Sequence, residues 1–202
     1  MTNAAWNPTS PFDFAPSATQ DSELLQQLNF IPGLKEILML RQVHALEHAT
    51  VWVLSNQTPN GVPTTEENAL GGMSTDEGFY LYGNVQIAQL RCAVQTALER
   101  ITRGEWDLAV HPRCGTNLSV GMLLAAGVAV GTHLILPKGP IEQLLALGVA
   151  ATAATQLAPD VGSLAQRYIT TAIPFNLEIA EIAATQDLWG RSAHFVRVRW
   201  RE

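Results

Sequence analysis

The chain has 202 residues and a formal net charge of −6, with 15% of its residues charged and 47% hydrophobic. This length fits one domain, or a small domain with an appendage. Because phosphate binding needs clustered Lys and Arg, the acidic balance and the lack of a basic run exclude nucleic acid as a main partner.

The first twenty residues are rich in Pro and small polar side chains and contain neither a basic start nor an apolar run. This composition predicts a disordered leader over residues 1–20 and no signal peptide. Asp21 and Ser22 can cap a short helix that runs to about Phe30, before Pro32-Gly33 ends it. We expect residues 21–117 to form a soluble domain that begins with this helix.

The segment His44-Ala45-Leu46-Glu47-His48 is an H-x-x-E-H motif in a register that predicts a helix from Gly33 toward Leu54. Residues three and four apart are neighbours on a helix, so His44, Glu47 and His48 share one face. Two imidazoles at this spacing can bind one zinc ion while the carboxylate acts as a base toward water. The alternative is a buried polar cluster in which Glu47 orients one imidazole and no metal is bound.

The next stretch predicts a loop, a strand and a helix. Residues 56–72 are polar and rich in Pro, Asn and Gly, which is typical of a loop that either covers the site as a lid or is a plain surface loop. Residues 78–83 are aromatic and can form half of a hairpin. Residues 85–103 are amphipathic, with Cys92 expected as core filler, and residues 106–110 are expected to be extended.

The segment His111-Pro112-Arg113-Cys114-Gly115 adds an imidazole and a thiol, which both suit zinc. Pro112 restricts His111 to extended geometry, and Gly115 permits a tight turn. Zinc needs three or four protein ligands, so His111, Cys114 or both can complete the shell begun by the two motif histidines. Two cysteines give no disulfide framework, which indicates a reducing compartment.

Residues 118–158 are the most apolar part of the chain. Residues 118–136 carry no formal charge unless His133 protonates, a Pro137-Lys138-Gly139-Pro140 turn follows, and residues 141–158 are again mostly apolar. A 19-residue helix is about 28 Å long, close to the thickness of a bilayer core. Small residues recur at a spacing that lets membrane helices approach closely, at Gly121/Ala125, Gly127/Gly131 and Ala150/Ala154.

We therefore predict a transmembrane hairpin over residues 118–158. The alternative is a buried helical hairpin in a soluble bundle, but burying both helices on all sides needs a larger protein. Cys114 lies four residues before the first span, so the candidate site is expected at the membrane surface. Residues 159–202 are expected to add helices and a strand that pack on the soluble domain. The strand, His194–Arg201, alternates strictly and is expected at a solvated edge. The fold class is α+β and mostly helical.

The two motifs together resemble two sets of uncharacterised bacterial membrane proteins. One is a domain-of-unknown-function family typical of cyanobacteria, which is similar to most of the chain from about Gln42 to Arg199. The segments that carry this resemblance are His44-Ala45-Leu46-Glu47-His48-Ala49-Thr50, Gly78-Phe79-Tyr80-Leu81-Tyr82-Gly83 and His111-Pro112-Arg113-Cys114-Gly115-Thr116-Asn117. The other is a broader family of integral membrane proteins predicted to bind metal. It is similar over the two motif segments alone, and its Gly-Ala-Glu-His stretch departs from Ala45-Leu46-Glu47-His48.

Both resemblances imply a membrane-associated protein whose motif residues form one site, and neither implies a defined activity. The expected function is a membrane-anchored zinc protein in which Glu47 serves hydrolysis of a peptide or lipid-like bond. If His44, His48, His111 and Cys114 all bind the metal, Glu47 becomes an orienting residue and the hydrolase interpretation weakens.

Two other interpretations stay open. One is a non-enzymatic assembly or accessory factor of a membrane complex, a photosynthetic one under the cyanobacterial resemblance. The other is a soluble helical protein without a metal. The expected partners are the lipid bilayer and other membrane proteins, and the expected location is the plasma or thylakoid membrane with the soluble part on the cytoplasmic side.

Overall fold

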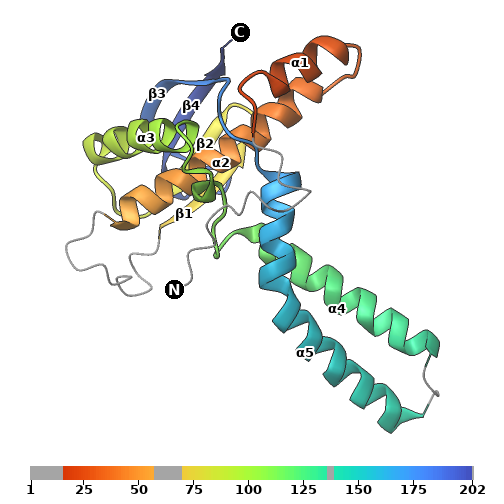
Figure 1. The fold of residues 1–202 in the computed structure, drawn as a ribbon. Coiled ribbons are helices and arrows are strands. Elements are labelled where there is room, and N and C mark those ends of the chain that lie inside the picture. The colour runs from red at the N-terminus through yellow and green to blue at the C-terminus, as the bar shows by residue number, and fades with distance from the viewer. Residues whose placement is uncertain (1–15, 57–69, 136–138, 202) are drawn as a thin grey trace. The chain divides into compact units, whose positions relative to one another are not determined.

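The computed structural model describes residues 16–56, 70–135 and 139–201 (Figure 1). It divides into two compact units, one made of the chain up to residue 110 together with residues 171 onward, and one made of residues 111–170. Most of the expected leader and of the expected 56–72 loop, including its role as a lid, falls on residues outside the described ones. The described helices and strands confirm an α+β, mostly helical fold.

The first unit combines three helices with an antiparallel sheet. Its elements are α1 (Gln20–Gln27), α2 (Leu34–Asn56), β1 (Gly71–Thr75), β2 (Gly78–Tyr82), α3 (Ile87–Thr102), the short 3-10 helix η2 (Trp106–Ala109), β3 (Leu177–Gln186) and β4 (Ser192–Trp200). The described strands form a four-stranded sheet in the order β1-β2-β4-β3. Helix α2 packs against β1 and β2, while α3 packs against α2 and β3 (Figure 1). The motif helix and the hairpin at residues 78–83 are thereby confirmed.

One core joins α2, β2, α3, β3 and β4, because each of them contributes apolar side chains at its own period. Helix α3 buries one stripe, made of Leu90, Ala93, Val94, Ala97 and Ile101. Strand β2 buries Phe79 and Leu81, which alternate with half-buried tyrosines. Helix α2 has buried apolar residues on most of its circumference, including Val43, Leu46 and Val53, so it is the central helix of the unit.

Three expectations for the first unit were wrong. The expected extended segment at 106–110 is a 3-10 helix as far as Ala109, and only Val110 is extended. Cys92 is exposed rather than core filler, because it lies off the buried stripe of α3. Strand β4 is central rather than an edge, since β2 and β3 pair with its two sides. In β4, buried Val196 and Val198 alternate with exposed arginines, which shows that one face of the strand is buried. A central strand and an edge strand can both have one buried face, so this pattern does not distinguish them.

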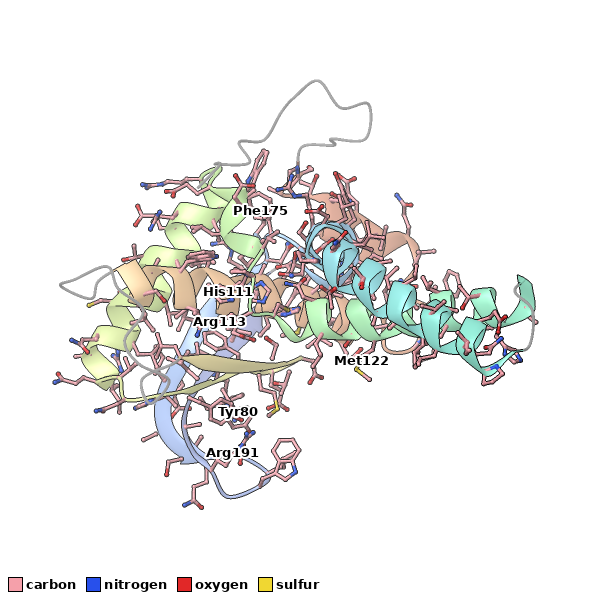
Figure 2. The ribbon with its side chains drawn as sticks, turned by 90° about the horizontal axis from the view of Figure 1, so that it is seen from below. Tyr80, His111, Arg113, Met122, Phe175 and Arg191 are labelled. Carbon is pink, nitrogen blue, oxygen red and sulfur yellow. The ribbon has the colours of Figure 1, made fainter. Side chains whose placement is uncertain are left out.

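The second unit is a helical hairpin of α4 (Gly115–Ile135) and α5 (Pro140–Ala165), followed by a π-helix, η3 (Gln166–Thr170). The helical segments Gly115–Leu134 and Pro140–Thr170 are both long enough and apolar enough to cross a membrane, judged by length and composition alone. Large apolar side chains on both helices are exposed, and Met122 is seen projecting from α4 in Figure 2. After Thr170 the chain returns to the first unit, where it forms β3 and β4.

Small residues line the contact between α4 and α5. Ala146, Ala150 and Ala154 of α5 are buried at a spacing of four, as is Gly162 further along. Gly121 of α4 faces this stripe, because a Cβ added there would lie 3.3 Å from the Ala158 Cβ. A Cβ added at Gly127 or Gly131 would meet no described atom within 4 Å, so that G-x-x-x-G pair does not mediate the hairpin contact in the described chain.

The chain enters and leaves the second unit from residues that are bonded to α2. Before it, the Trp52 indole N–H donates to the Val110 carbonyl at 3.0 Å. After it, the Arg41 guanidinium donates to the Thr171 carbonyl at 3.1 Å, and the Ala172 N–H donates to the Arg41 carbonyl at 3.0 Å. Within the first unit, one helix therefore fixes both attachment points of the hairpin.

Replacing Phe79 by Ala tests the shared core. Phe79 is 0% exposed, so we expect Phe79→Ala to lower the free energy of unfolding by about 3–5 kcal/mol. The control is Leu188→Ala at the β3–β4 turn, where the side chain is 86% exposed and a change within about 0.5 kcal/mol is expected. Urea unfolding of the detergent-purified full chain measures both, and equal losses would contradict this core.

Candidate metal centre

Helix α2 presents the two motif histidines side by side. The rings of His44 and His48 lie 4.4 Å apart, centroid to centroid, in an edge-on arrangement. Their spacing of four residues places them one turn apart on the face that also carries Arg41 and Trp52. His48 is buried and His44 is half-buried, so the pair lies at the margin of the core.

The ring of His48 is oriented by the segment that follows α3. Its Nδ1 lies 2.6 Å from the carbonyl oxygen of Ala109, which can only accept, so Nδ1 carries the proton and donates. This tautomer makes Nε2 the metal-binding nitrogen. A histidine whose other ring nitrogen donates to a backbone carbonyl is the usual arrangement of a metal ligand.

Glu47 is buried beside the histidines and held by the first strand. The Ser74 hydroxyl donates to Glu47 Oε2 at 2.5 Å, and the Glu47 residue is 8% exposed. Burial raises the pKa of the Glu47 carboxyl above its ordinary value, although the Ser74 hydrogen bond and the electrostatic interaction with His44 act to lower it. A carboxyl with a raised pKa next to two imidazoles is suited to accepting and returning a proton.

Gly72 is the reason that Glu47 can lie against β1. A Cβ on Gly72 would overlap the Oε1, Cδ and Cγ atoms of Glu47. Both Gly72 and Ser74 lie on the side of β1 that faces α2, two residues apart as the strand period requires. Sequence reasoning missed both residues. It assigned Gly72 to the polar loop and had no strand pattern in Gly71–Thr75 to work from.

The second unit carries the other two candidates in one tight turn. The Cys114 N–H donates to the His111 carbonyl at 3.2 Å, and the Cys114 residue directly precedes α4. The Thr116 N–H donates to Cys114 Sγ at 3.4 Å. The sulfur therefore lies at the N-terminus of a helix, where the peptide dipoles favour a negative charge such as that of a metal-binding thiolate.

His111 uses its Nδ1 within the turn. The Arg113 N–H donates to this atom at 3.3 Å, and the two residues lie close together in Figure 2. Because Nδ1 accepts, a neutral ring carries its proton on Nε2, and binding a metal there would require that proton to leave. Of the two candidates in this turn, Cys114 therefore has the better ligand geometry.

Comparisons with known proteins identify the family of the chain and a close relative. The profile of a family described as a domain of unknown function, DUF6391, matches residues 39–182. An uncharacterised protein of Picosynechococcus sp. strain PCC 7002 is 52% identical over 192 residues, which cover 94% of this chain and 93% of that protein. No solved structure matches.

Replacing Gly72 by Ala tests the contact between β1 and Glu47. The new Cβ would push the carboxylate off its Ser74 partner, so we expect Gly72→Ala to lower the free energy of unfolding by about 1–3 kcal/mol. Gly71→Ala is the control, since its Cβ would meet only a Tyr82 ring carbon at 4.0 Å. Chemical denaturation of both variants measures this, and equal stabilities would show that Glu47 does not lie against Gly72.

Proposed function

We propose that this chain, which belongs to the DUF6391 family, is a membrane-anchored zinc protein that hydrolyses a peptide or lipid-like bond at the membrane surface. The observation that carries the proposal is the face of α2. There a pair of histidines, one with its tautomer fixed by a backbone carbonyl, lies beside a buried carboxylate that Ser74 orients.

The donor chemistry supports one metal ion. Under this proposal, His44 and His48 of α2 and Cys114 of the second unit would each offer one ligand atom to a single ion. Two imidazoles and a thiolate suit zinc. Three protein ligands are the number used in catalytic zinc sites, which keep one coordination position open, whereas four ligands are typical of structural sites.

The chain itself limits how far Cys114 can lie from the histidines. Val110 is bonded to Trp52, one turn of α2 beyond His48, and Cys114 follows Val110 by four residues. Four residues span at most about 14 Å, so the Cα of Cys114 lies within that reach of Val110 whatever the arrangement of the two units. The thiol is thereby tethered to the neighbourhood of the histidine face.

The hairpin supports a membrane location for this site. Both α4 and α5 are long and apolar enough to cross a bilayer, and α4 begins directly after Cys114. A turn that precedes a membrane span lies at the water–lipid boundary. The cytoplasmic side for the first unit, and the choice between plasma and thylakoid membrane, stay predictions from the sequence.

Glu47 is the proposed general base. A bound zinc would polarise water and the carbonyl of the substrate. Glu47 takes a proton from the attacking water and returns it to the leaving group, while Ser74 keeps the carboxylate aimed and Gly72 gives it room. The burial that raises the pKa of Glu47 favours this exchange of a proton.

The second candidate is a non-enzymatic assembly or accessory factor of a membrane complex. The bonds from α2 to Val110 and Thr171, which flank the hairpin in sequence, favour it, because a metal on the same helix would join the two units. In that case Glu47 orients His44 and takes no part in chemistry. The two candidate functions predict different effects of removing the Glu47 charge, because only the hydrolase needs Glu47 as a base.

Metal analysis tests the site. We expect one equivalent of zinc in detergent-purified protein, with His48→Ala and Cys114→Ala each losing most of it because three ligands become two. The matched controls are His133→Ala and Cys92→Ala, which change the same residue types at exposed positions outside the trio and should keep a full equivalent. Protein that holds no metal when purified without chelators would overturn the proposal.

Substitution of Glu47 separates the hydrolase from the accessory factor. We expect Glu47→Gln to keep one equivalent of zinc and to lose hydrolysis by a factor on the order of 10²–10⁴, since the base is removed while the ligands remain. Wild-type and variant proteoliposomes are incubated with membrane peptides and lipids, and the products are counted by mass spectrometry. Hydrolysis at wild-type rate in Glu47→Gln, or none in either protein, contradicts the hydrolase.

A further inference from the structure

Gln166 is a fully buried amide that bonds to both sides of the turn bearing Cys114. It is 0% exposed and is the first residue of the π-helix η3. Its Oε1 accepts the His111 N–H at 2.8 Å, and its Nε2 donates to Asn117 Oδ1 at 2.8 Å. One side chain from the C-terminal end of the hairpin thus bonds both ends of the segment from His111 to Asn117.

Asn117 completes the connection. Its Nδ2 donates to the Pro112 carbonyl at 2.8 Å, so the two amides together fix backbone groups at positions 111 and 112. Gly162 lies one helical turn before Gln166, and a Cβ there would overlap Asn117 Oδ1 and approach its Cα. The glycine therefore lets Asn117 come close enough to α5 for the amide pair to form.

This network suits a ligand-bearing turn. Residues 111–114 precede α4 and belong to no helix or strand, so their shape depends on such bonds. Buried amides whose donors and acceptors are satisfied make a segment rigid. The π-helix strengthens the case, because single π-turns are rare and occur frequently at functional sites.

We propose that Gln166 is a positioning residue of the metal centre, which holds the 111–114 turn in the conformation that presents the Cys114 thiolate. This inference rests on the proposed function, in which Cys114 is a ligand. Gln166 itself does not touch the metal or the substrate. Substituting Gln166 is therefore expected to change the metal affinity and the geometry of the sulfur ligand, while the number of metal sites stays the same.

The main variant is Gln166→Met, which keeps the length of the side chain and removes both hydrogen bonds. We expect zinc affinity, measured by competition with a chromophoric chelator on the detergent-purified full chain, to fall about 10- to 100-fold, with one site still filled at saturation. In the cobalt-loaded protein, the absorption band of the cobalt–thiolate bond should weaken. Gln156→Met is the matched control, because Gln156 is an exposed residue of α5, the helix that leads directly into η3, and it should leave both readouts unchanged.

A second variant and a metal-free readout guard against a folding defect. Gln166→Glu keeps the size of the side chain and the acceptor for the His111 N–H. It should therefore keep more of the zinc affinity than Gln166→Met does. In zinc-free protein, hydrogen exchange at the His111 amide should be faster in Gln166→Met than in wild-type protein, because the bond that protects it is gone.

The outcomes separate the two claims. Wild-type zinc affinity in Gln166→Met overturns the positioning role, whether or not exchange at His111 is faster. If wild-type protein binds no zinc, the proposed function fails and the role of Gln166 at a metal fails with it. Exchange at His111 then still decides whether Gln166 holds the turn. Weaker affinity in Gln166→Met, recovery in Gln166→Glu and no change in Gln156→Met support the inference.

Discussion

Helix α2 carries two imidazoles and a carboxylate at the margin of a mostly apolar core, and each buried polar atom there needs a partner. The rest of the first unit is arranged to supply those partners. The Ala109 carbonyl accepts from His48, and the Ser74 hydroxyl donates to Glu47. Strand β1 is short and has no buried residue, so its position is explained mainly by its contact with this helix.

The same helix also determines where the apolar hairpin is attached. Val110 and Thr171, which flank the second unit in sequence, are each bonded to α2, through Trp52 and Arg41 respectively. A change at the α2 face can thereby reach both connections to the hairpin. This coupling is compatible with an enzyme that works at a membrane surface and with a factor that senses or joins parts of a membrane complex.

Sequence reasoning succeeded where the signal is local and periodic. The spacing of His44, Glu47 and His48 predicted a shared helical face, and the long apolar runs predicted the hairpin. It failed where the assignment depends on which segments pair in three dimensions. Strand β3 was missed because a bulge between Ile179 and Glu181 breaks its alternation, and β4 was taken for an edge because alternation reports burial and not neighbours. Ser74 and Gln166 could not be found from spacing, since their partners lie 27 and 55 residues away.

X-ray absorption at the zinc K-edge of the purified full chain tests the central claim most directly, because it reads the ligand atoms around the metal. The account predicts one sulfur at about 2.3 Å and nitrogen or oxygen atoms at about 2.0 Å, as two imidazoles, one thiolate and a water would give. A shell of nitrogen and oxygen alone would remove Cys114 from the site. A shell dominated by several sulfurs would contradict a centre built on the His44 and His48 face.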